Sequence, residues 1–84
     1  MGNPRERPAH LAAKLLTIRQ ALGLSQSELI AKLRRNLSTA RISEYEKGTR
    51  IPSLFTLLAY ARVARVSVEI LIDDNLELPE RLQT

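Results

Sequence analysis

Residues 38–48 have the sequence Ser-Thr-Ala-Arg-Ile-Ser-Glu-Tyr-Glu-Lys-Gly, which is typical of a short helix. It begins with two residues that can cap a helix and ends at Gly48, which can stop one. At 3.6 residues per turn, Ile42 and Tyr45 fall on one side, whereas the other side carries small or polar residues. A helix this short is not stable alone in water. We therefore expect its apolar side to be docked on a scaffold and its outer side to be free for a partner.

Apolar residues at helical spacing predict four further helices, which would form that scaffold. A capping box, Ser25-Gln-Ser-Glu28, begins the second one, and Gly23 separates it from the first. The expected spans and apolar stripes are 9–22 with Leu11, Leu15, Ile18 and Leu22; 25–34 with Leu29, Ile30 and Leu33; 53–64 with Leu54, Leu57, Leu58 and Ala61; and 67–72 with Val68, Leu71 and Ile72. Lys14 falls outside the first stripe. No segment alternates as a strand does, so the predicted fold is all-α, a compact five-helix bundle.

The chain divides into three parts around one domain. Residues 1–8 hold two prolines and a glycine and are expected to form a flexible arm. Residues 9–72 form the helical domain. Residues 73–84 form an acidic tail, which is either disordered or held only by three leucines: Leu76, Leu78 and Leu82.

Charge is distributed unevenly along the 84 residues, whose net charge is +4. Residues 1–50 hold ten Lys or Arg and four Asp or Glu, whereas residues 51–84 hold three and five. A basic half is typical of a surface that binds a polyanion, and equally of a solvated surface that is basic by chance. The chain has no cysteine and no apolar run of about 20 residues. We therefore expect a cytoplasmic protein that does not enter a membrane.

The residues of an enzyme are not present in a recognisable arrangement. The single histidine, His10, precedes the first predicted helix, where a surface or capping role is the common outcome. Glu44 and Glu46 are two residues apart on a helix and so point in different directions. The three glycines form no phosphate-binding cluster. We expect no catalysis, no cofactor and no metal.

Two helices joined by a turn, the second with a bare outer face, have the organisation of a helix-turn-helix, whose second helix enters the DNA major groove. Ala40 and Ser43 are small enough to allow close approach to base edges, and Ala40 could contact a thymine methyl group. Basic residues flank this helix: Arg34, Arg35, Lys47 and Arg50. The alternative is a surface helix with basic neighbours of no consequence.

Three separated motifs carry a resemblance to a known family. They are Gly23-Leu-Ser-Gln-Ser-Glu-Leu29, Ile42-Ser-Glu-Tyr-Glu-Lys-Gly-Thr-Arg-Ile-Pro-Ser-Leu54 and Val66-Ser-Val-Glu-Ile-Leu71. In this order they resemble the Cro/CI (XRE-type) helix-turn-helix family over residues 11–72. The resemblance implies a lambda-repressor-like bundle that binds operator double-stranded DNA as a homodimer on two half-sites, as a transcriptional regulator, most commonly a repressor.

The resemblance also implies roles for individual residues. Gln26 would touch a phosphate, Thr39, Ala40 and Glu44 would face the bases, and Arg19 would form a structural ion pair with Glu46. Glu44 would be tolerated among phosphates mainly by accepting a hydrogen bond from a cytosine amine. The complete set of predicted DNA-binding residues is Gln26, Ser38, Thr39, Ala40, Arg41, Ser43, Glu44, Lys47, Thr49 and Arg50.

Two departures from the family pattern affect these expectations. The segment from Leu33 to Ile42 is about two residues longer than usual and lacks a glycine, so Ser38, Thr39 and Arg41 are all candidates to lead into the groove. Arg65 stands where a glycine is common, and a left-handed conformation there would cost about 1 kcal/mol.

A second function class remains open. The same fold serves in protein-interaction modules, such as antitoxins and adaptors, whose main partner is another protein. In that case the apolar residues of the last two helices, or of the tail, would form the contact. These residues could also form a two-fold contact between copies, or pack on their own subunit.

Overall fold

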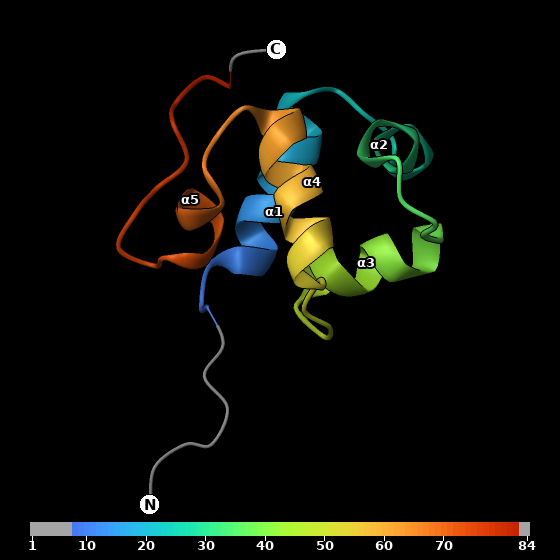
Figure 1. Ribbon diagram of the computed structural model, residues 1–84, viewed down its shortest axis with the longest axis horizontal. Coiled ribbons are helices and arrows are strands. Elements are labelled where there is room, and N and C mark those ends of the chain that lie inside the picture. Colours follow the sequence, from blue (N-terminus) through green and yellow to red (C-terminus); the bar gives the residue numbers. More distant parts are fainter. Residues whose placement is uncertain (1–7, 83–84) are drawn as a thin grey trace, which may run out of the picture.

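The computed structural model describes residues 8–82, which form five helices and no strand (Figure 1). They are α1 (Leu11–Ala21), α2 (Gln26–Leu33), α3 (Thr39–Lys47), α4 (Leu54–Ala64) and α5 (Val68–Ile72). The all-α five-helix prediction is confirmed for this part of the chain. The predicted arm, apart from Pro8, lies outside the described residues.

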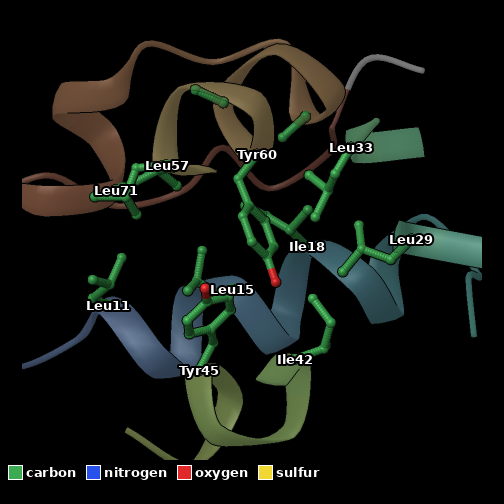
Figure 2. Packing of buried hydrophobic residues seen from close by; sticks show 12 residues of the cluster. Leu11, Leu15, Ile18, Leu29, Leu33, Ile42, Tyr45, Leu57, Tyr60 and Leu71 are labelled. Atoms are coloured by element: carbon green, nitrogen blue, oxygen red, sulfur yellow. The ribbon is translucent and has the colours of Figure 1, made fainter. Parts of the chain in front are cut away.

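Helices α1 and α4 lie at the centre of the molecule (Figure 1). Helices α2 and α3 lie on one side of them, and α5 with the following segment lies on the other side. Helix α3 packs on α1 and α2, while α4 packs on α2 and α5. The core between these elements contains Tyr60 from α4, which is fully buried beside Leu15 and Ile18 of α1 (Figure 2).

The helix boundaries follow local rules that the sequence displays. In the capping box of α2, the Ser25 hydroxyl accepts a hydrogen bond from the Glu28 N–H, and the Glu28 carboxylate accepts one from the Ser25 N–H. The Ser53 hydroxyl caps α4 in the same way as Ser25 caps α2, by accepting from the N–H of Thr56. Arg65 takes the left-handed conformation at the end of α4, with a φ of 59°. The family's glycine conformation is thus kept without the glycine.

The prediction that Lys14 lies outside the buried face of α1 is wrong. Its side chain is 8% exposed, and its ammonium group donates hydrogen bonds to the backbone carbonyls of Ile70, Asp73 and Leu76 at 2.7, 3.1 and 2.8 Å. The aliphatic stem lies in the core while the charge satisfies carbonyls around the end of α5. One lysine therefore fastens the C-terminal segment to α1.

The sequence left the segment after α5 either disordered or held only by three leucines, and in the structure a carboxylate also holds it. Asp74 accepts hydrogen bonds from the backbone N–H groups of Ala9 and His10, at 2.8 and 3.1 Å. These two bonds lower the pKa of Asp74 below its ordinary value. Leu78 and Leu82 pack against the core, whereas Leu76 is 39% exposed.

Two further predictions about apolar stripes are wrong. Leu54 belongs to the expected apolar stripe of α4, but it is 68% exposed, and its neighbour Phe55 is 67% exposed. Ile72 was assigned to the apolar face of α5 and is 42% exposed. Leu54 is the first residue of α4 and Ile72 is the last residue of α5. At these helix ends the neighbouring segments no longer cover the apolar side.

Candidate nucleic-acid interface

Helix α3 is fixed at both ends and along its inner face. The Ser38 hydroxyl accepts a hydrogen bond from the N–H of Arg41 at 3.1 Å, so Ser38 is the cap and Thr39 the first helical residue. Gly48 ends the helix in the left-handed conformation, with a φ of 81°. Ile42 and Tyr45 are buried and point toward α1 and Tyr60 of α4 (Figure 2). The outer face of α3 is therefore held in one orientation.

The ion pair implied by the family resemblance is present and joins α1 to α3. Arg19 donates from Nε to Glu46 Oε2 at 2.6 Å and from Nη2 to Oε1 at 3.0 Å, in a two-pronged arrangement. Its Nη1 donates to the carbonyl of Leu24 at 3.0 Å. Hydrogen bonding to Glu46 raises the pKa of Arg19 above its ordinary value. Because the Glu46 side chain is only 6% exposed, this pair is part of the support beneath the interface.

Gln26 connects the first turn of α2 to the middle of α3. Its side-chain amide donates to the Ser43 hydroxyl at 3.0 Å and to Glu46 Oε1 at 3.3 Å. Two residues predicted to contact DNA are thus bonded to each other, and Gln26 is also bonded to the ion pair. This network aligns the N-terminus of α2 with the outer face of α3.

Glu44 lies between two guanidinium groups. Its Oε1 is 3.0 Å from Nε of Arg41 and 3.1 Å from Nε of Arg50. The spacing of Arg41 and Glu44, three residues apart on a helix, is a recognised pairing signal in sequence. The approach of Arg50 is not, because Arg50 lies beyond the end of α3. The carboxylate that the sequence presented as a liability near phosphates is therefore flanked by two positive charges.

The start of the loop after α3 is ordered by hydrogen bonds to the end of that helix. Thr49 donates from its backbone N–H to the carbonyl of Glu44 at 3.0 Å and from its hydroxyl at 3.3 Å. Gly48 provides the reversal that makes this possible. Arg50 is thereby held next to Glu44 at the edge of α3.

The structure brings the predicted DNA-binding residues together on α3, its two flanks and the start of α2. Six of them are exposed: Ser38, Thr39, Ala40, Lys47, Thr49 and Arg50. Four are partly buried: Gln26, Arg41, Ser43 and Glu44. Arg34 and Arg35, which the sequence placed beside α3, line a groove between α2 and α4. The charged groups around the outer face are Arg41, Lys47, Arg50 and Glu44, so positive charge dominates there.

Residues 8–82 contain no group of three or more His, Cys, Asp or Glu placed to hold a metal ion. Within the same residues no helix has the length and apolar character needed to cross a membrane.

Helix α3 is docked on the domain and has a small, polar outer face, and α2 and a turn precede it. This arrangement defines a helix-turn-helix protein. The profile of a protein family described as "Helix-turn-helix" matches residues 15–71. The chain belongs to this family, which is the Cro/CI (XRE-type) family of DNA-binding regulators. A search of characterised proteins finds no match to the chain.

Proposed function

We propose that this protein binds specific sequences of double-stranded DNA and regulates transcription, with α3 as the helix that enters the major groove. One observation carries the proposal: α3 is locked from beneath by a buried face and an ion pair, while its outer face offers small and polar groups framed by cations. Rigid presentation of this kind suits direct readout, because base edges are distinguished by the positions of donors and acceptors.

The positions of the side chains divide the proposed contacts into two groups. Base contacts come from the outer face of the first turns: Thr39, Ala40, Arg41, Ser43 and Glu44. Phosphate contacts come from the periphery: Gln26, Ser38, Lys47, Thr49 and Arg50. Arg41 has two roles open to it, because its guanidinium can bind a guanine or a phosphate.

Glu44 is the specificity residue whose role is easiest to isolate. We expect Glu44→Ala to change or loosen the preferred sequence, because it removes an acceptor from the outer face and frees Arg41 and Arg50. Selection of bound sequences from random duplexes measures this. Unchanged selectivity would contradict the assignment.

The proposed mode of action is repression in the cytoplasm, with two copies on neighbouring half-sites. A domain seated in the major groove blocks other proteins from the same site by occupying it. Two copies together read a longer sequence than one, which improves discrimination against non-specific DNA. We infer repression and the pairing of two copies from the family and from the small size of α3.

Arg50→Ala tests the phosphate contacts. Arg50 is exposed at the flank of α3, and each lost phosphate contact makes the slope of log affinity against log salt shallower by about one unit. We expect weaker binding to all duplexes and this change in slope. Arg81→Ala removes the same charge from an exposed site outside the interface and should leave the slope unchanged. Equal slopes for the two variants would count against the assignment.

A second candidate function, a protein-interaction module, is favoured by the two exposed apolar side chains at the start of α4, Leu54 and Phe55. Exposed apolar groups of this size mark contact surfaces when they are clustered. A gel shift with random duplex DNA over a salt series separates the two functions. A pure protein adaptor would not retard the duplex at any salt concentration.

A further inference from the structure

A groove runs along α4, between that helix and α2. Its larger part has a volume of about 470 Å³ and is lined by the end of α2, the next turn and one face of α4. A second hollow of about 260 Å³ shares Lys32 and Val63 with it. Among residues 8–82, five cations line the two parts and no carboxylate does: Lys32, Arg34, Arg35, Arg62 and Arg65. We term this surface the basic groove.

The positive charge of the basic groove is not neutralised within residues 8–82. The ion pairs of this part of the chain involve arginines that lie elsewhere: Arg19, Arg41 and Arg50. In the groove, Arg34 and Arg65 keep their charge even though they have a φ of 56° and 59°, where a glycine would be relaxed. A cluster of like charges repels itself, and a partner that brings carboxylates relieves this repulsion.

Helix α4 is apolar on both of its sides. Of its eleven residues, only Thr56, Tyr60 and Arg62 carry a polar side-chain group. The side that faces the core consists of buried residues: Leu57, Tyr60, Ala61 and Ala64. The opposite side carries a second apolar set, which lines the groove: Phe55, Leu58, Ala59 and Val63. A helix that is apolar all round is ordinarily covered on all sides. The groove side of α4 has no such cover within residues 8–82, because Phe55 is 67% exposed there.

The spacing and length of this second apolar set fit a helix as the occupant of the groove. The stretch from Phe55 to Val63 extends about 12 Å along α4, slightly more than two turns. A helix with an apolar face of similar length would pack against it. Carboxylates on either side of that face would meet the cations of the groove. A phosphate backbone would also neutralise the cations, but it would leave the apolar set uncovered.

We propose that the basic groove binds an acidic amphipathic helix of another protein. The apolar face of that helix packs on the groove side of α4, and its carboxylates pair with the five cations. None of the residues that line the groove is among the proposed DNA contacts. The groove is therefore a separate site for a protein partner, and it is tested without DNA.

The test is a titration of the isotope-labelled whole chain with a synthetic peptide, followed by amide chemical shifts. The probe is an amphipathic peptide of about four helical turns, with Leu along one face and Glu and Ala elsewhere. We expect the shifts to concentrate in the basic groove, and the Kd to rise as salt is added. One control peptide has Lys in place of Glu, and another has the same composition with the leucines scattered. Both should bind at least about tenfold more weakly.

Two charge-reversed variants separate the groove from the surface around α3. Lys32→Glu with Arg62→Glu reverses two exposed charges of the groove and should weaken binding of the acidic peptide at least about tenfold. Lys47→Glu with Arg50→Glu makes the same change at exposed sites beside α3 and should bind this peptide nearly as tightly as the unaltered chain. The peptide with Lys should gain affinity for the groove-reversed variant.

A second pair of variants tests the apolar part of the contact. Phe55 and Leu54 are almost equally exposed, at 67% and 68%, but only Phe55 lines the groove. Phe55→Ser should weaken binding of the acidic peptide about tenfold, because it removes a ring that the contact buries. Leu54→Ser should leave binding unchanged. Equal affinities of these two variants would contradict the proposed contact.

Four further results would overturn the proposal. The peptide shifts would be absent, or would concentrate on the outer face of α3. The two charge-reversed variants would lose binding equally, which would indicate general attraction to a basic protein. Amide shifts in the groove would change with protein concentration without any peptide, which would assign this surface to a second copy. Short duplex DNA would displace the peptide, which would assign the cations to a phosphate backbone.

Discussion

Removing Arg19 alone should destabilise the domain more than removing its whole ion pair. The Glu46 side chain is 6% exposed and accepts bonds of 2.6 and 3.0 Å from Arg19, but only one of 3.3 Å from Gln26. Arg19→Met therefore leaves a buried carboxylate with one weak partner. Loss of one partner of a buried ion pair lowers the free energy of unfolding by about 3–5 kcal/mol. The lower end applies because Arg19 is 19% exposed and its site can admit water. In a domain of this size the melting temperature should fall by about 12 °C or more.

The double variant Arg19→Met with Glu46→Leu is the decisive comparison. It removes both charges and replaces them with apolar groups, so it should be more stable than Arg19→Met alone. Thermal and urea unfolding followed by circular dichroism measure the free energies of unfolding. Two results would show that the ion pair does not support α3. Arg19→Met could lower the free energy of unfolding by less than about 1 kcal/mol, or the double variant could lose as much stability as the two single variants together. Because the proposed DNA contacts do not include Arg19, the folded fraction of either variant should keep the salt slope of DNA binding.

Three further predictions concern the support around the interface. Tyr60→Phe removes a buried hydroxyl that has no hydrogen-bond partner in residues 8–82, so it should leave stability unchanged or raise it by up to about 1 kcal/mol; a clear loss in thermal unfolding would reveal a missed partner. Lys14→Met removes the ammonium donor from three carbonyls, of which that of Asp73 keeps a bond from the Leu76 N–H, and should cost about 2 kcal/mol, with faster amide exchange in residues 70–76; unchanged exchange there would refute the fastening role. Hydrogen bonds from Ser25 lower the pKa of Glu28 below its ordinary value, so its contribution to stability is complete above the pKa of the unfolded state and is lost as pH falls through the lower pKa of the folded state. Glu28→Gln should therefore show a weaker decline of stability over that acidic range, and an identical decline would contradict this.

The helix boundaries could be predicted because the signals are local. The capping box at Ser25, and the reversals at Gly23 and Gly48, depend on residues within one turn of each other. The position of Lys14 could not be predicted in the same way. Its acceptors lie 56 to 62 residues further along the chain, and helical periodicity assigns any lysine to the solvent side.

The location of the candidate site could be predicted from the sequence, but the hydrogen bonds between its residues could not. The family motifs located the outer face of α3, and spacing alone would suggest the pair of Arg41 and Glu44. The hydrogen bond from Gln26 to Ser43 joins α2 to α3, and the bond from Arg50 to Glu44 joins the following loop to α3. Both depend on how these segments pack against each other. The same reason explains the exposed Leu54, because periodicity indicates a helix face without indicating where the core ends.

A substitution at Ala40 tests whether the outer face of α3 lies against DNA bases. Ala40 is exposed at the start of α3, so Ala40→Glu should leave the melting temperature nearly unchanged while placing a carboxylate against the base edges. On duplexes selected with the unaltered protein, its affinity should fall by at least about tenfold. Ala13→Glu makes the same change on the exposed side of α1 and should bind as the unaltered protein does. If Ala40→Glu binds the selected duplexes as tightly as Ala13→Glu, α3 does not enter the groove.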